Sequence, residues 1–398
     1  MMSVTSSRLP DISIFAAAFI AALCLPARAS ESPAATVGLS IMTEKPITRE
    51  DFADHTLREQ VATFGFGPRS YAIAYRVGVP PKEKDTGRVV PIEGYIGMPR
   101  PSSCNWYHGG FLFVSINGHD IGTTPITSMM AVESGGRAIV DLVWEASDAD
   151  VRVRFLGLPG RDYLATEISI DPKQEINKLE LSLRCYPSFF TSHHKREGAR
   201  RIQTPSTLIE QGSRTTLPAA ENWWAVYYDD VFDVAKGEGS GPCAVLIPPG
   251  EASEVSFDPG GYAVSTSISY PPDTRTIRLA FWEFTGATNA DALARVQAGA
   301  EEIGRMLLET DFRPRSVQEF RVEETRELLE AILKSPDARE ALADDIEQIR
   351  TWLSDHAPAL EAPGTPPGVA AEERLLRSID MFQSFKWRVK LYELINGI

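Results

Sequence analysis

Between residues 70 and 288, hydrophobic and polar residues alternate over short runs that are separated by turns rich in glycine and proline. One side of the run 179–185 consists of Leu179, Leu181, Leu183 and Cys185. A period of two is typical of a β-strand with one buried face. Pro187 ends this strand, because proline has no N–H group to donate to a neighbouring strand. About a dozen such runs, with no helical pattern between them, predict a mainly β fold, an antiparallel β-sandwich over 70–288.

The pattern changes at Asn289, where hydrophobic residues begin to recur at steps of three and four. The resulting stripe consists of Leu293, Val296, Ala300, Ile303 and Leu307. This spacing predicts a helix with one apolar face, and Asn289 is a suitable N-cap. Further helices are expected to start at Ser316, at Ser335 and near residue 370. We therefore predict an α-helical region over 289–398, with a linker rich in proline and glycine at 357–368.

The last predicted helix carries three aromatic residues, Phe382, Phe385 and Trp387. They can bind a partner or support self-association through the C-terminal helices. The alternative is that they pack against the rest of the chain, as most aromatic residues on an amphipathic helix do.

The segment before the sandwich, 30–69, is expected to be a leader with one short helix. Residues 48–62 contain the signals for that helix: Thr48 can cap it, and Asp51 places a negative charge in its first turn.

The first 29 residues resemble a signal peptide. An apolar run at 12–25 is broken by Pro26, and Ala27-Arg28-Ala29 places small residues where a signal peptidase cuts. We expect cleavage after Ala29 and a secreted or periplasmic protein. No later apolar run is long enough to span a membrane, so no transmembrane segment is expected after cleavage.

The chain is acidic, with a formal net charge of −14. The expected signal peptide carries one more cation than anions, so its loss leaves the rest near −15. This charge argues against nucleic-acid binding, which requires a cationic face. It also argues against binding to anionic membranes through bulk charge.

Three cysteines remain after cleavage: Cys104, Cys185 and Cys243. So small and odd a set is not a disulfide framework. Either two of them form one bridge, or all three are buried thiols that act as small hydrophobic residues. No pair has the spacing of a zinc site, and no phosphate-binding loop or Gly-x-Ser-x-Gly sequence occurs. No metal or cofactor is therefore predicted.

Histidines and carboxylates supply the candidates for proton transfer. The pair Asn117-Gly118 predicts a tight turn, and His119 follows it directly. His193 lies in the polar loop after the strand 179–185, and Asp229 ends another predicted strand. These three are the candidate catalytic residues, and His108 and His194 are the other histidines of the β domain that could act as a general acid or base. The alternative is that each is an ordinary loop or solvent-facing residue.

A second group of residues suggests ligand binding. Aromatic rings can stack on sugar rings, and carboxylates can accept hydrogen bonds from hydroxyls. The loop 188–201 is also locally basic and can bind an anionic group. The candidate ligand-binding residues are Trp223, Trp224, Asp230, His194, Arg200 and Arg201. The alternative is that the tryptophans lie in the core and that the acids and arginines are solvated or pair with one another.

Several strand-like runs follow one another with a characteristic rhythm: Val143–Glu145, Val151–Phe155, Tyr163–Glu167 and Leu179–Pro187. In this rhythm the chain resembles the galactose-mutarotase-like β super-sandwich, a fold shared by sugar epimerases and by domains of carbohydrate-active proteins. The resemblance implies sugar binding. The Asn-His-x-x-x-Asn signature of aldose epimerases is missing from the sequence, so the resemblance implies no catalytic residue.

These patterns together predict an exported β-sandwich protein that binds or processes carbohydrate, possesses a helical C-terminal region, and has a glycan as its partner. Whether it is an enzyme stays open. The alternative is a non-enzymatic envelope or structural protein whose helical tail mediates assembly.

Overall fold

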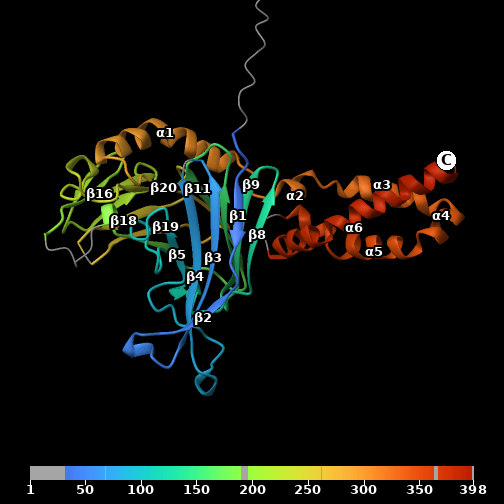
Figure 1. Cartoon of the computed structure of the whole chain (residues 1–398), viewed down its shortest axis with the longest axis horizontal. Coiled ribbons are helices and arrows are strands. Elements are labelled where there is room, and N and C mark those ends of the chain that lie inside the picture. The colour runs from blue at the N-terminus through green and yellow to red at the C-terminus, as the bar shows by residue number, and fades with distance from the viewer. Residues whose placement is uncertain (1–31, 68, 190–195, 261, 363–365, 397–398) are drawn as a thin grey trace, which may run out of the picture. The chain divides into compact units, whose positions relative to one another are not determined.

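The computed structural model describes residues 32–67, 69–189, 196–260, 262–362 and 366–396. Two large antiparallel sheets face each other and form a β-sandwich, which helices follow in the chain (Figure 1). The predicted fold class is therefore confirmed. The expected signal peptide lies outside the described residues.

The larger sheet, called sheet A, has eleven strands. They are β1 (Thr36–Leu39), β2 (Thr43–Pro46), β3 (Thr56–Phe66), β4 (Arg69–Val79), β5 (Ile96–Arg100), β6 (Leu112–Ile116), β7 (His119–Asp120), β12 (Leu179–Cys185), β15 (Thr215–Pro218), β18 (Glu254–Asp258) and β19 (Val264–Tyr270). Their order is β1-β3-β4-β5-β6-β12-β19-β18-β15, with β2 paired to β3 and β7 paired to β6.

The second sheet, called sheet B, has nine strands. They are β8 (Ser128–Ser134), β9 (Arg137–Glu145), β10 (Ala149–Gly157), β11 (Tyr163–Pro172), β13 (Arg200–Gln203), β14 (Leu208–Glu210), β16 (Trp224–Asp229), β17 (Cys243–Leu246) and β20 (Thr276–Glu283). Their order is β14-β13-β16-β17-β20-β11-β10-β9-β8.

The main core lies between the two sheets and is formed by the inward side chains of both. In β12 the four residues of the predicted apolar side are all buried, while Glu180, Ser182 and Arg184 point outward and are half-buried. The three cysteines are buried free thiols, two of them in this core. Alternation along β12 thus leaves a polar row on the outer face of sheet A.

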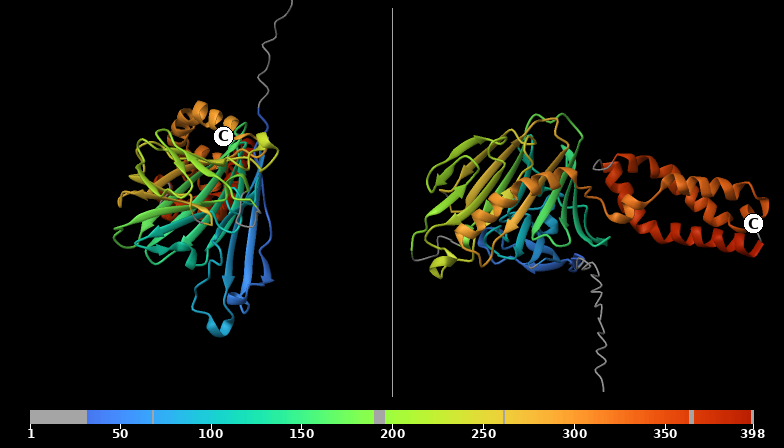
Figure 2. Two further views of the ribbon diagram at one scale, coloured as in Figure 1. Left: turned by 90° about the vertical axis from the view of Figure 1, so that its left-hand side faces the viewer. Right: turned by 90° about the horizontal axis from the view of Figure 1, so that it is seen from above.

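Helix α1 (Asn289–Glu309) lies across the outer face of sheet B (Figure 1, Figure 2). Its stripe of Val296, Ala300, Ile303 and Leu307 is buried against outward side chains of the sheet. The N-cap is Thr288 rather than Asn289, because the Thr288 side chain accepts a hydrogen bond from the Asp291 N–H. The apolar side of α1 and the outward apolar side chains of sheet B thus bury each other, because an apolar helix face needs an apolar partner.

The remaining helices form a bundle with its own apolar core. They are α2 (Arg315–Glu319), α3 (Val322–Leu333), α4 (Pro336–Ala341), α5 (Ala343–Asp355) and α6 (Pro366–Asn396), with a short 3-10 helix at Ala357–Glu361. Phe382 and Phe385 are buried in the bundle core, whereas Trp387 is exposed. Among the described residues, no helix combines the length and apolar character needed to cross a membrane.

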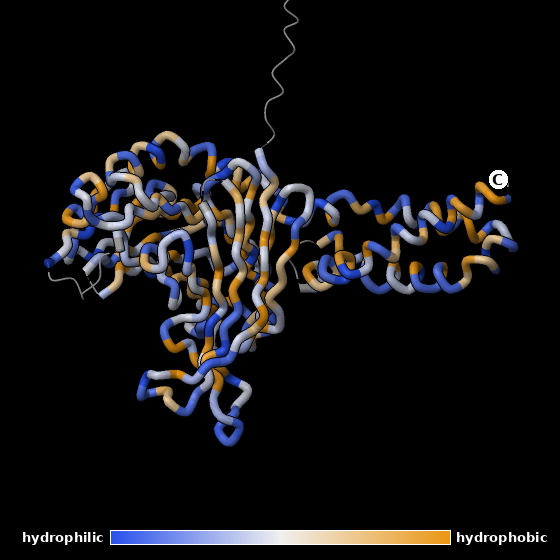
Figure 3. The backbone as a smooth tube through the Cα atoms, in the orientation of Figure 1, coloured by the Kyte–Doolittle hydropathy of each residue, from blue (hydrophilic) through white to orange (hydrophobic). Residues whose placement is uncertain are grey.

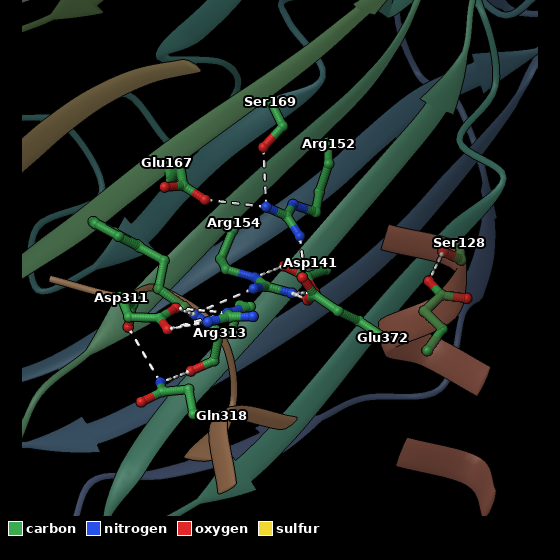
Figure 4. A network of polar contacts seen from close by, with 12 residues as sticks. Ser128, Asp141, Arg152, Arg154, Glu167, Ser169, Asp311, Arg313, Gln318 and Glu372 are labelled. Carbon is green, nitrogen blue, oxygen red and sulfur yellow. Dashed lines mark hydrogen bonds and ion pairs between the residues drawn. The ribbon is translucent and has the colours of Figure 1, made fainter. Parts of the chain in front are cut away.

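A buried ionic network joins the bundle to sheet B (Figure 4). Glu372 of α6 accepts hydrogen bonds from Arg154 at 2.9 Å and from Arg152 at 3.4 Å, both on β10. Arg154 also forms a two-point pair with Asp141 at 2.6 and 2.7 Å. Burial works against the charged form, but the negative charges of Asp141 and Glu372 raise the pKa of Arg154.

The prediction of a helix over 48–62 is wrong. The structure has only a 3-10 turn at Glu50–Phe52, and β3 begins at Thr56. β3 pairs with β4 over eleven positions, from Thr56 opposite Val79 to Phe66 opposite Arg69. This long ladder overrides the local helix signals, so the sandwich already includes part of the expected leader. The predicted Asn-Gly turn is confirmed, with positive φ at Asn117 and Gly118.

Candidate functional site

The outer face of sheet A presents hydroxyl groups on four adjacent strands. The register aligns Thr216 of β15 with Ser256 of β18, Ser256 with Ser267 of β19, and Ser267 with Ser182 of β12. The next residue in this row is Phe113 of β6, opposite Ser182. The row therefore combines hydrogen-bonding groups with an aromatic ring on a rigid support.

Arg184 stands at the end of β12 beside this row. Its guanidinium lies 4.9 Å from the ring centre of Phe113 and donates a hydrogen bond of 2.7 Å to the main-chain oxygen of Glu93. Stacking on the ring and this hydrogen bond hold the cation in place. An arginine held in this way can receive an anionic or hydroxylated ligand without first being ordered.

Four rings follow one another past the end of β12. The ring centres of His108 and Tyr107 are 4.7 Å apart, those of Tyr107 and Tyr186 are 4.9 Å apart, and those of Tyr186 and Tyr262 are 5.3 Å apart. Tyr262 is exposed, Tyr107 and His108 are half-buried, and Tyr186 is buried. We call these four residues the aromatic row. Such a row offers apolar ring surface and hydroxyl groups together, which suits sugar rings.

The aromatic row is held from the core side by a buried carboxylate. Glu283 of β20 is fully buried and accepts hydrogen bonds from the Asn105 side chain at 2.8 Å and from the Trp106 N–H at 3.4 Å. Trp106 itself packs in the core, with its ring centre 5.1 Å from that of Phe281. Through these hydrogen bonds a residue of sheet B holds in place the segment that carries Tyr107 and His108. That segment belongs to the side of the sandwich formed by sheet A.

Glu93 connects the aromatic row to a neighbouring cavity. The Tyr107 hydroxyl donates a hydrogen bond of 3.1 Å to Glu93 Oε2. The cavity has a volume of about 390 Å³, and Arg76, Glu93 and Gly109 are among the residues that line it. Arg76 is paired with Glu59 at 3.0 Å. The site thus contains a carboxylate that is fixed by a phenol and lines a cavity.

The tyrosines of the row act as neutral hydrogen-bonding groups. Burial, together with the charge of Glu93 and its hydrogen bond, raises the pKa of Tyr107. Burial, followed by the influence of Tyr262, raises the pKa of Tyr186 to about 12. At neutral pH neither phenol is a base, and each can donate a hydrogen bond to a ligand or to a carboxylate.

His108 is the group best suited to proton transfer here. Its Nδ1 lies 2.9 Å from the main-chain oxygen of Ser103. A carbonyl only accepts, so Nδ1 carries the proton and Nε2 of the neutral ring is an acceptor. His108 and Glu93 therefore combine a base and a carboxylate around Tyr107. Within the described part of the chain, no cluster of three or more histidines, cysteines or carboxylates could hold a metal ion.

The structure places His119 at the other end of this sheet. His119 follows β6, and its Nδ1 donates to Asp148 Oδ2 at 3.1 Å. The start of β6 lies next to the end of β12, where Leu183 is opposite Leu112. The turn at 117–120 is therefore separated from the aromatic row by the length of β6.

The predicted tryptophans and acids lie in β16 of sheet B or directly next to it. Trp224 is buried in the core beneath α1, and Trp223 packs against the same core. Asp229 is fully buried, and its side chain accepts from the N–H groups of Val231 and Phe232. Asp230 accepts a hydrogen bond of 2.8 Å from Arg201.

Arg200 is the one described candidate that reaches the aromatic row. It is buried and donates a hydrogen bond of 2.9 Å to the main-chain oxygen of Tyr262. His193 and His194 lie outside the described residues.

The residues that sequence reasoning did not assign to a site are Glu93, Tyr107, Phe113, Arg184, Tyr186 and Tyr262. Some signal was present. Arg184 stands on the polar side of an alternating strand, and the segment 107–110, Tyr-His-Gly-Gly, places two glycines after two rings. These glycines allow close backbone contact, since a Cβ on Gly110 would collide with Gly94.

No protein-family model matches the chain, and no curated protein matches it. Solved structures do resemble it. A "putative aldose 1-epimerase" from Klebsiella pneumoniae has 10% identity and a TM-score of 0.34, over 67% of this chain and 95% of that chain. The alpha-N-acetylgalactosaminidase NagBb from Bifidobacterium bifidum has 11% identity and a TM-score of 0.37, over 67% and 39% of the two chains.

Heparan sulfate lyase HepC from Pedobacter heparinus has 8% identity and a TM-score of 0.34, over 57% of this chain and 36% of that chain. The chain thus spans nearly all of the first structure and less than half of the other two. All three TM-scores are below 0.5, and no activity, substrate or residue of this chain follows from these likenesses.

Proposed function

We propose that this is an exported protein that binds carbohydrate on the outer face of sheet A. The observation that supports the proposal best is the aromatic row, which stands directly beside the fixed pair of Glu93 and Arg184. Sugars present apolar ring faces and a rim of hydroxyls. Ring surface, a carboxylate, an arginine and strand-borne hydroxyls in one place match both parts of such a ligand.

The arrangement also suggests which chemistry a bound sugar could undergo. If the protein is an enzyme, His108 Nε2 acts as the base and Glu93 as the second proton-transfer group, in an epimerase or lyase type of reaction. Tyr107 positions Glu93 through its hydrogen bond. Arg184 would then bind a hydroxyl or carboxylate of the substrate.

A glycan array, followed by calorimetry with the best ligand, tests the binding proposal. Arg184→Gln and Tyr262→Ala are expected to weaken binding about tenfold each, because each removes one hydrogen-bonding or stacking group. Arg275→Gln is the matched control, since in the described part of the chain the Arg275 side chain donates to main-chain oxygens of its own turn, those of Pro272 and Thr274. Failure of every glycan to bind, or equal loss in all three variants, refutes the proposal.

Mutarotation and lyase assays on the sugars that bind then decide between binding and turnover. Turnover that His108→Ala abolishes without weakening binding supports catalysis. Binding without turnover makes the protein a carbohydrate-binding module.

A further inference from the structure

The last turns of α6 carry an apolar stripe that nothing in the described chain covers. Its residues, with their exposed fractions, are Trp387 (72%), Leu391 (50%), Leu394 (80%) and Ile395 (72%). Their spacing of four, three and one places them on one side of the helix. Figure 3 shows hydrophobic positions at this end of α6, next to the C mark. Four of the ten large hydrophobic side chains that are exposed in the described residues therefore lie within nine positions.

Folding of the bundle does not account for this stripe. The opposite side of this half of α6 already supplies the bundle core, through Phe382 and Phe385 just before the stripe and Val389 within it. A helix on the surface of a globular protein normally has one apolar side. A second apolar side that stays in water is costly, so it indicates contact with something outside the chain.

The charges around the stripe identify the kind of surface that it fits. Lys386, Arg388 and Lys390 surround it, and Glu393 is the one acid between positions 386 and 396. Arg388 forms an ion pair with Asp345 at 3.0 Å. The chain as a whole has a net charge of −14. A cationic rim in so acidic a protein is matched by an anionic partner.

Symmetric pairing with a second copy fits less well. In such an interface the same patch meets itself. The cations around one stripe would then approach the cations around the other. An anionic lipid surface instead offers negative charge to the rim and an apolar layer to the stripe. Tryptophan favours the membrane interface, and lysine side chains can extend from an apolar surface toward the headgroups.

We propose that the stripe and its cationic rim, residues 386–395 of α6, bind the surface of an anionic lipid bilayer. The acidic remainder of the chain does not prevent this, because charges more than about 8 Å away are screened at physiological ionic strength. The stripe is also far from the ionic network that joins α6 to sheet B. Glu372 stands fifteen residues before Trp387, or about 22 Å along the helix. The contact is peripheral and reversible.

Vesicle co-sedimentation of the whole chain tests this proposal. The protein is expected to sediment with vesicles of phosphatidylcholine and phosphatidylglycerol in equal parts, and not with phosphatidylcholine alone. Binding should fall as salt is added. Trp387→Ala combined with Leu394→Ala should lower the partition coefficient about tenfold or more. Lys386→Gln and Lys390→Gln should each lower it about fivefold.

Leu308→Ala is the matched control, because Leu308 is an exposed leucine (48%) on α1, away from the stripe. Circular dichroism verifies that each variant is folded. Equal sedimentation with neutral and anionic vesicles, or loss of binding in Leu308→Ala to the same degree, overturns the proposal. Light scattering without vesicles gives a further decisive result: a dimer that Trp387→Ala dissociates would assign the stripe to a second copy instead.

Discussion

The hydroxyl of Tyr107 donates a hydrogen bond of 3.1 Å to Glu93 Oε2 and thereby joins two segments that meet at the end of sheet A. The same glutamate accepts a hydrogen bond from Arg184 through its main-chain oxygen. One residue thus positions a phenol with its side chain and a guanidinium with its backbone. The site depends on this geometry more than on any local sequence motif.

Tyr107→Phe removes the hydrogen bond to Glu93 and keeps the ring. The carboxylate of Glu93 loses its fixed orientation, so affinity for the bound glycan is expected to fall about three- to tenfold, as for the loss of one hydrogen bond. Calorimetry measures the affinity. The thermal midpoint should change little, because the phenol is only half-buried; a large fall in stability with unchanged affinity would show that the bond is structural.

Gly109→Ala tests how closely this site is packed. A Cβ at Gly109 would collide with Glu93 Oε2 and would lie 2.6 Å from Cε1 of the Tyr107 ring. Urea denaturation is expected to show a loss of about 1–3 kcal/mol in the free energy of unfolding. Gly38→Ala is the control, since a Cβ at Gly38 meets nothing within 4 Å. Equal effects in the two variants would mean that the loss reflects a general effect of replacing glycine by alanine and not the collision at Gly109.

The sandwich could be predicted because its core depends on alternation that is local in the sequence. In β12 the apolar positions 179, 181, 183 and 185 are the buried ones. The helix predicted over 48–62 failed for the opposite reason: the pairing of β3 with β4 is decided by contacts between strands, and a cap signal at Thr48 does not report it.

The site escaped prediction because its members are far apart in the chain. Glu93 and Arg184 are separated by 91 positions, and Tyr186 and Tyr262 come from different strand ends. Trp223 and Trp224 suggested a ligand surface, but the sequence does not show that α1 packs over them. Which outer face a helix covers depends on how the whole chain packs.

Glu372→Ala should weaken the connection between the bundle and sheet B. It leaves Arg152 and Arg154 buried with fewer negative partners, which costs about 3–5 kcal/mol when a buried pair is broken. Hydrogen exchange should increase along α6 and β10. Glu373→Ala is the neighbouring control: Glu373 is more exposed and contacts Arg377 at 3.6 Å and Ser128 at 3.3 Å, so its loss should cost less than about 1 kcal/mol.

The same network predicts a loss of stability in acid. Burial works against the charge of Asp141, but Arg154 outweighs this and lowers the pKa of Asp141 below its ordinary value of 3.8. A group whose pKa is depressed in the folded state stabilises the protein fully above its unfolded pKa. That stability is lost as the pH falls below about 4 and through the folded pKa.

Urea midpoints measured from neutral pH down to about pH 3 should therefore fall more steeply for the native chain than for Asp141→Asn. Parallel curves for the two proteins would show that Asp141 does not contribute to the dependence on pH.

The buried thiols should resist modification in the folded protein. Burial, followed by a hydrogen bond with Cys185, raises the pKa of Cys243 well above its ordinary value. The thiolate is the reactive form, so Cys243 combines low access with a low thiolate fraction. Mass spectrometry after iodoacetamide treatment at neutral pH should show Cys185 and Cys243 unlabelled in the native chain and fully labelled in urea. Labelling of Cys243 at the same rate in both conditions would contradict its burial between the sheets, whereas a mass lower by two hydrogens that persists in urea would show that the two thiols have formed a bridge.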